Sequence, residues 1–260
     1  MPTPKGAITS EEDGPDPWLG SSAILDTEDP RLRLRAVAIT QLCRTERDRI
    51  LALYAYVKRI PFAKPRKLRL HTARDVLDAT TGDAEDKASL LVAMLRCCGF
   101  PARLRYIEMH GDVLQGLTTA MPSVARPVLE VWRQDRWIST DTYIFDARFI
   151  TAARKRMAKQ GMEWGYGMHV HGESLWDGRH DAYLIGAPAV AAEVSMGDIG
   201  VFHDPLEFYH SEACRSRFPR IARLVRWNLL TASFDRAVSD LRAQSESDTR
   251  PPPEAEGQTA

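Results

Sequence analysis

The stretch that decides the fold runs from Gly82 to Arg103, GDAEDKASLLVAMLRCCGFPAR. The residues from Gly82 to Ala88 open a helix, and apolar residues recur at helical spacing from Ala88 until Gly99 ends it. This pattern predicts a helix over about 83–98. The period changes afterwards, because basic and apolar residues alternate at the start of the next segment, which indicates a strand over 103–109.

A second stretch, RPVLEVWRQDRWISTD, runs from Arg126 to Asp141. It has the pattern of a β-hairpin, with strands over 128–132 and 137–140 on either side of the turn residues Gln134-Asp135. A helix followed by antiparallel strands predicts an α+β fold in which the helix packs on an antiparallel sheet.

The rest of the chain supplies helices around this centre. Asp29 followed by Pro30 is a helix start signal, and Thr45 with an acid three residues later is another. Further helices are expected over 147–160, 205–212 and 218–242. We therefore expect a body over 25–243, in which a core over 25–150 carries a C-terminal extension over 151–243. The polar segments 1–24 and 244–260 are expected to be a loose arm and a disordered tail.

Composition excludes several classes of function. The chain has 35 Lys and Arg residues against 35 Asp and Glu residues, so it has no net field to attract nucleic acid. It contains no apolar run that could span a membrane and no secretory signal pattern, so we expect a cytoplasmic protein. Its four cysteines lack the spacing of a zinc site, so they are expected to be buried and reduced.

Together, the two stretches quoted above resemble the transglutaminase-like domain family, which belongs to the papain-like cysteine-enzyme superfamily. The resemblance covers about residues 29–150, and the continuation GYGMHVHGESLWDG over 165–178 is similar to bacterial members. In that family a thiol lies at the N-terminus of the helix, one strand carries a catalytic histidine, and the next strand carries an aspartate. The resemblance implies the same core fold here.

Two of the three catalytic positions are substituted in this chain. The thiol position is occupied by Ala84 and the histidine position by Arg126, while Asp141 remains. A methyl group cannot act as a nucleophile, and a guanidinium cannot act as a general base. The resemblance therefore implies a catalytically degenerate pseudoenzyme that needs no cofactor or metal and whose cleft binds a protein or peptide ligand.

The alternative is an active cysteine-type acyltransferase, amidase or peptidase. It would require that Ala84 is an engineered change and that a nearby histidine such as His110 is the base. Cys97 cannot replace the missing thiol, because it lies roughly 20 Å further along the same helix. Arg126 is expected to form a bidentate ion pair with Asp141 that fills the pocket, in preference to a site for a carboxylate or phosphate.

Three other features have a structural and a functional interpretation. His169 and His171 could share one face of a strand and bind a metal with His180 or His203, as in a metal-dependent hydrolase, but loop histidines are the stronger interpretation. Trp176 is interpreted as a structural corner rather than a cleft residue. The apolar residues of 217–241 predict a helix packed on the domain rather than one that binds a membrane.

Overall fold

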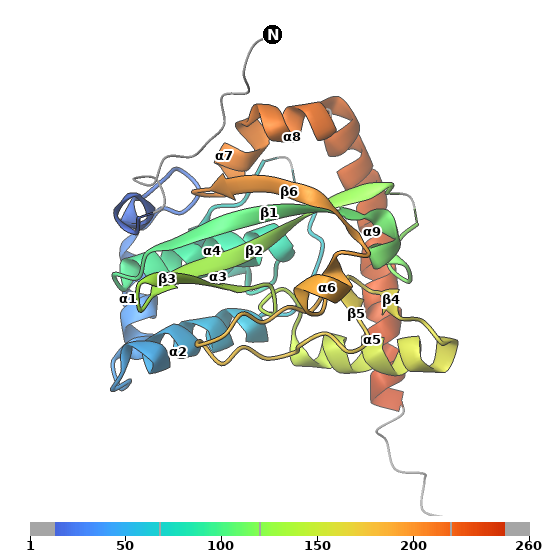
Figure 1. Ribbon diagram of the computed structural model, residues 1–260, viewed down its shortest axis with the longest axis horizontal. Coiled ribbons are helices and arrows are strands. Elements are labelled where there is room, and N and C mark those ends of the chain that lie inside the picture. Colours follow the sequence, from blue (N-terminus) through green and yellow to red (C-terminus); the bar gives the residue numbers. More distant parts are fainter. Residues whose placement is uncertain (1–13, 68, 120, 219, 248–260) are drawn as a thin grey trace, which may run out of the picture.

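The computed structural model describes residues 14–67, 69–119, 121–218 and 220–247. A four-stranded antiparallel sheet forms its centre, in the order β3-β2-β1-β6, and helix α4 packs against one face of this sheet (Figure 1). The predicted α+β fold is thereby confirmed.

The first half of the chain is helical, and side-chain caps define where its helices begin. Asp29 Oδ1 accepts hydrogen bonds from the first N–H groups of α1, and the Thr45 side chain accepts one at the start of α2. Asp83 caps α4 in the same way, whereas the sequence predicted that the helix itself begins at about Asp83. The helices are α1 (Pro30–Thr40), α2 (Glu46–Arg59), α3 (Ala73–Ala79) and α4 (Ala84–Cys97).

Helix α4 is buried along almost its whole surface, because α1, α2 and α3 contact it and the sheet also packs against it. The sequence predicted a single buried face. The difference arises because even the polar residues of α4 find partners inside: Lys87 Nζ donates to the carbonyl oxygens of Lys58 and Ile60, and the Arg96 guanidinium donates to that of Ala102.

The sheet begins with the predicted strand and hairpin. Gln134 and Asp135 both have positive φ values, 53° and 56°, which suits the tight two-residue turn between β2 and β3. In the β1–β2 register, Ile107 lies opposite Arg126. The strands are β1 (Ala102–His110), β2 (Ser123–Arg133), β3 (Arg136–Thr140) and β6 (Ser195–Phe202).

Strand β6 was not predicted from the sequence. It pairs antiparallel with β1, and its register shifts twice along the pairing. Gly197 and Gly200, with φ values of 141° and 131°, lie where the pairing is irregular. These irregularities remove the clean alternation that would mark a strand in the sequence.

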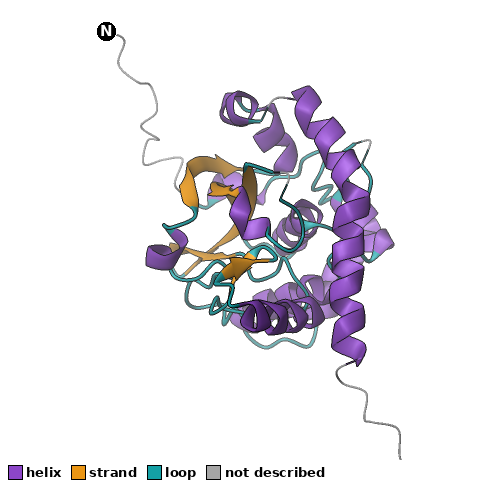
Figure 2. Cartoon of the chain, turned by 90° about the vertical axis from the view of Figure 1, so that its right-hand side faces the viewer, coloured by secondary structure: helices purple, strands orange, loops and turns teal. Residues whose placement is uncertain are grey.

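The C-terminal part surrounds one end and one edge of the sheet. Helix α9 runs along one end, from α8 to α5, and it is seen lengthwise in Figure 2. The single helix expected over 205–212 is split, because Ser211 ends α7 and caps α8. The remaining elements are η2 (Gly111–Leu114), α5 (Ala147–Gln160), β4 (Trp164–Gly165), β5 (Met168–His169), α6 (Pro188–Ala191), α7 (Pro205–His210), α8 (Glu212–Arg217) and α9 (Arg220–Ser247).

The expected arm and tail lie partly outside the described residues, which exclude 1–13 and 248–260. Within the expected arm, the turn η1 (Asp16–Leu19) buries Trp18, which stacks on His203 with 4.4 Å between ring centroids. At the other end, α9 continues to Ser247, four residues into the expected tail. Throughout the described residues, every helix is too short or too polar to cross a lipid bilayer.

Candidate functional site

The N-terminus of α4 is closed by its own acidic cap. Asp83 Oδ1 accepts hydrogen bonds from the N–H groups of Glu85 and Asp86, both at 3.1 Å. The residue before the cap is a glycine, Gly82. A Cβ at that position would lie only 2.7 Å from the Cβ of Asp86, so a side chain there would clash. Ala84 is the first helical residue, and two of the N–H groups that could attract an anion at this helix end already have partners.

A buried cluster of charges surrounds this cap. Lys67 Nζ lies 2.8 Å from Asp83 Oδ2 and 2.6 Å from Asp86 Oδ1. Burial alone would lower the pKa of Lys67, but the two carboxylates outweigh it and raise that pKa. Glu85 accepts a hydrogen bond from the Tyr209 hydroxyl, and burial, followed by the charge of Asp83, raises the pKa of Glu85 to about 7.

Arg126 on β2 and Asp141, the residue after β3, form a buried ion pair. Arg126 Nε donates to Asp141 Oδ2 at 2.6 Å, and Asp141 has no exposed surface. The pair is not bidentate, so that prediction was wrong. Asp141 Oδ1 instead accepts from the backbone N–H of Leu184 at 2.6 Å, and Arg126 Nη1 donates to the carbonyl oxygen of Gly167 at 2.8 Å.

One donor of this arginine remains unused. Arg126 is 94% buried, and its Nη2 is enclosed without a hydrogen-bond partner among the described residues. A buried guanidinium N–H without an acceptor is costly, because it has lost its hydration without compensation. Arg126 therefore has hydrogen-bonding capacity that its ion pair leaves unsatisfied.

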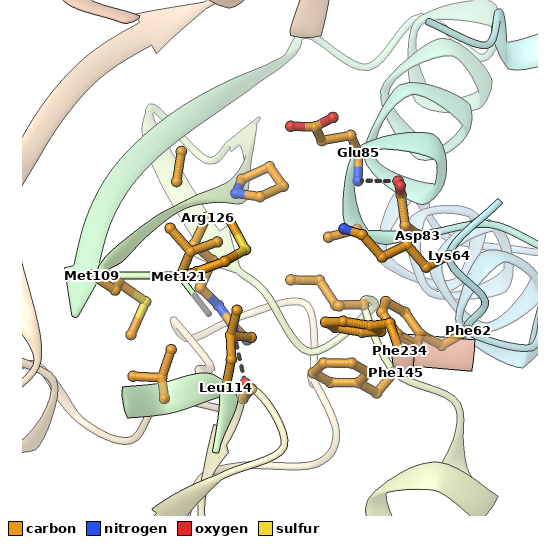
Figure 3. Close-up of a pocket in the computed structure, with 17 residues that line it drawn as sticks. Phe62, Lys64, Asp83, Glu85, Met109, Leu114, Met121, Arg126, Phe145 and Phe234 are labelled. Carbon is orange, nitrogen blue, oxygen red and sulfur yellow. Dashed lines mark hydrogen bonds between the residues drawn. The ribbon is translucent and has the colours of Figure 1, made fainter. Parts of the chain in front are cut away.

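Ala84 and Arg126 both line a cavity of about 90 Å³. Figure 3 shows two walls: one is formed by Arg126 with apolar side chains, and the other by aromatic rings with the charged side chains near α4. The first wall includes Met109, Leu114, Met121 and Arg126, and the second includes Phe62, Phe145, Phe234, Lys64, Asp83 and Glu85.

Lys64 is a cation on the aromatic wall. Its Nζ lies 4.9 Å from the centroid of the Phe234 ring, and its backbone N–H donates to Asp235 Oδ1 at 3.1 Å. Burial lowers the pKa of Lys64 to about 8, although the carboxylates of Asp83 and Glu85 act in the opposite direction. Both walls of the cavity therefore carry a cationic side chain.

The structure brings the three predicted site residues into one region. Ala84 lines the cavity at the start of α4, and Arg126 lines it from β2. Asp141 accepts a hydrogen bond from Arg126 but does not line the cavity itself. The separation of fifteen residues between Arg126 and Asp141 places Arg126 on β2 and Asp141 directly after the end of β3, one residue beyond the strand that the sequence predicted to carry it.

The histidines singled out in the sequence lie elsewhere. His110 ends β1 with an exposed side chain and does not line the cavity. The rings of His169 and His171 lie 5.7 Å apart. Among the described residues, no three His, Cys, Asp or Glu side chains are grouped so that they could hold a metal ion. The metal-dependent alternative therefore gains no support from this part of the chain.

Trp176 is a structural residue, as expected. It is 5% exposed, its ring lies against that of Tyr54, and its Nε1 donates to the carbonyl oxygen of His180 at 2.8 Å. Cys97 lies at the opposite end of α4 from Ala84, and burial, followed by the neighbouring Cys98, raises the pKa of its thiol to about 11. It therefore remains a protonated thiol at neutral pH.

Several site residues could not be identified from the sequence. Gly167 and Leu184 contribute only backbone groups, which every residue type has, and Phe234 reaches the cavity from α9. The one available signal was Gly167 itself, whose φ of 79° requires a residue without a side chain. That signal marks a turn and does not reveal which group the turn contacts.

Comparisons with known proteins find similarity to part of this chain. Residues 34–142 match the family model described as the transglutaminase-like superfamily. Among solved structures, the crystal structure of a proposed cysteine protease from Cytophaga hutchinsonii is 14% identical, with a TM-score of 0.46. The alignment covers 77% of this chain and 50% of that one, so the match spans half the length of that protein.

A search of curated protein sequences finds no match to this chain. The family match includes the helix that begins at Ala84, the strand that carries Arg126 and the position of Asp141. The match to the transglutaminase-like superfamily therefore includes all three predicted site positions.

Proposed function

We propose that this protein is a catalytically degenerate transglutaminase-like domain that uses its cleft to bind a ligand. The proposal depends on the observation that Ala84 and Arg126 both line one cavity. Where the family resemblance implies a thiol and an imidazole, this cavity presents a methyl group and a guanidinium. Neither group can perform the chemistry of nucleophile and base.

In the part of the chain that the structure describes, the cavity lining supplies no replacement for the missing thiol. Among the described residues, the cavity lining contains no cysteine, serine, threonine or histidine. Cys97 is at the far end of α4, and its raised thiol pKa opposes the formation of a thiolate. An active cysteine enzyme would need a cysteine thiol at the cavity.

The ion pair also argues against a catalytic role for Asp141. Asp141 would orient an imidazole in an active triad, but here one of its oxygens is occupied by Arg126 and the other by the Leu184 N–H. The aspartate has therefore become the counter-ion of a permanent cation. A cavity of about 90 Å³ holds only a few heavy atoms, so a protein or peptide ligand would enter it with one side chain or chain end.

Turnover measurements test the proposal directly. The purified protein should show no hydrolysis or transfer with amide and thioester substrates. Turnover by the native sequence that is lost in Asp141→Ala would show that the proposal is wrong.

Restoring the two family residues provides a second test. In the double variant Ala84→Cys with Arg126→His, the new thiol should have a lower pKa than in Ala84→Cys alone, as measured by pH-dependent alkylation with mass-spectrometric localisation. Ala147→Cys is the matched control, because Ala147 also follows an aspartate cap at the start of a 14-residue helix. An identical thiol pKa in the single and double variants would argue against an inherited cleft geometry.

A further inference from the structure

The cavity also has features that indicate which chemical class of ligand it binds. Arg126 presents an unused donor, Nη2, and the cavity that it lines is walled mainly by apolar side chains. In small-molecule sites, a few fixed polar groups orient a ligand whose remaining surface is apolar. The unused guanidinium donor is the polar group to be explained here.

We propose that the cavity binds a short-chain monocarboxylate, whose carboxylate accepts a hydrogen bond from Arg126 Nη2 and whose alkyl group lies against Phe62, Phe145 and Phe234. This inference rests on the proposed function, because it names the ligand class of the same cavity.

The charges on the walls favour a monoanion. Arg126 is paired with Asp141, and Lys67 is paired with both Asp83 and Asp86, so neither cation brings an unpaired positive charge to the cavity. Lys64 and Arg126 place one cationic side chain on each wall, and the carboxyl groups of Asp83 and Glu85 act against both, so the cavity suits a ligand with a single negative charge. A phosphate dianion would bring a second charge into a small cavity that also contains the carboxyl groups of Asp83 and Glu85.

The size of the cavity limits the alkyl group. An apolar cavity of about 150 Å³ holds a benzene ring, so about 90 Å³ suits a chain of roughly three or four carbon atoms. Arg126 Nη2 is itself covered by protein, so a ligand reaches it only when a neighbouring side chain moves. Met121 lies on the same wall (Figure 3), and methionine is the apolar side chain that adapts most easily.

The experiment is a titration with butyrate, in full-length protein with ¹³C-labelled methionine methyl groups. Signals of Met109 and Met121 should shift on binding because both residues line the cavity, while buried Met94 and exposed Met196 should not shift. Butyramide has the same shape without the charge. It should bind about tenfold more weakly or worse, because hydrogen bonds between charged partners are stronger.

Two variants assign the effect to the proposed contact. Arg126→Lys keeps a cation beside Asp141 but removes the planar donor, so butyrate binding should weaken by about tenfold or more. Ala84→Leu leaves Arg126 unchanged and fills the cavity, so it should abolish binding. Arg103→Lys is the matched control, because Arg103 is equally buried and ion-paired to Glu130 at 2.5 Å, but it does not line this cavity.

Absence of any shift at Met109 and Met121 would overturn the inference. Equal binding of butyrate and butyramide, or unchanged binding in Arg126→Lys, would also overturn it, because the unused donor would then be satisfied by water or not at all. These failures leave the proposed function standing, since that is decided by turnover. Turnover of substrate by the native protein would refute the proposed function, whatever result the butyrate titration gives.

Discussion

The guanidinium of Arg126 meets the carboxylate of Asp141 through one hydrogen bond of 2.6 Å, in a region where Asp141 has no contact with solvent. The pair joins β2 to the turn that follows β3. Both charges were removed from water when the chain folded, so each depends on the other to remain stable inside. This dependence leads to the first prediction.

Arg126→Met should destabilise the protein by about 3–5 kcal/mol, because it leaves the Asp141 carboxylate buried without a counter-ion. Adding Asp141→Asn should recover much of this loss, since the second change removes the unpaired charge. Urea unfolding measures both effects. Arg33→Met is the control: its partner Glu28 is exposed, so the loss should be at most about 1 kcal/mol. An equal loss in Arg126→Met and Arg33→Met would contradict the prediction.

Gly167→Ala should be more destabilising than Gly161→Ala. Both glycines have positive φ, 79° and 64°, so an alanine costs about 1–2 kcal/mol in backbone strain at either position. At Gly167 the added Cβ would also lie 2.7 Å from Phe145 Cζ, whereas at Gly161 it would meet open space. Phe145 is stacked on Phe149 and cannot move freely, which adds about 1–3 kcal/mol. Urea unfolding of the two variants should show this difference.

Stability should fall as the pH rises through the titration of Glu85. Its pKa is about 7 in the folded protein and near 4.5 when unfolded, so the folded state holds an extra proton between these values. The favourable contribution of the protonated form is therefore complete below pH 4.5 and lost by about pH 7. The groups that act on Glu85 are Asp83, Asp86, Lys67 and Tyr209, together with Lys64, Tyr106 and Tyr143.

Glu85→Gln should flatten this part of the pH dependence, by an amount on the order of 2 kcal/mol between pH 4.5 and pH 7. Unfolding free energies measured at both pH values provide the test, with exposed Glu193→Gln as the control. If native protein and Glu85→Gln lost the same stability over this range, the pH dependence would have to come from another group.

Alkaline pH should act in the opposite direction through Lys58. Its Nζ donates to the carbonyl oxygens of Thr142 and Phe145, at 2.6 and 3.2 Å, inside the protein. Burial lowers the pKa of Lys58 to about 8 from 10.5, although Asp141 and Asp146 act to raise it. Between these values the unfolded state binds more protons, so stability should rise with pH. Lys58→Met should reduce the slope of unfolding free energy between pH 8 and pH 10; an unchanged slope would refute this.

Much of the fold could be predicted because its signals are local. Asp29, Thr45 and Asp83 each accept hydrogen bonds from N–H groups within three residues, so a short window of sequence contains the whole interaction. The Gln134-Asp135 turn is local in the same sense. Strand β6 was missed because its pairing with β1 spans about a hundred residues and is irregular.

The site was predictable only in part, for a related reason. The positions of Ala84, Arg126 and Asp141 follow from the resemblance to the transglutaminase-like family, and the structure brings them into one region. The partners that decide how Arg126 and Asp141 bond are backbone groups of Gly167 and Leu184, more than forty residues away in the chain. No residue type is required to provide an N–H or a carbonyl, so no sequence pattern indicates such a contact.

The cavity extends beyond the segment that matches the superfamily. Residues 34–142 supply Ala84 and Arg126, but Phe234 on α9 and the Gly167 turn lie outside that match. The segment that matches the superfamily therefore forms only part of the cavity wall, and residues after 142 form the rest. Substitutions after residue 142 can change what enters the cavity without altering any residue of the matched segment, so two chains with the same match could prefer different ligands.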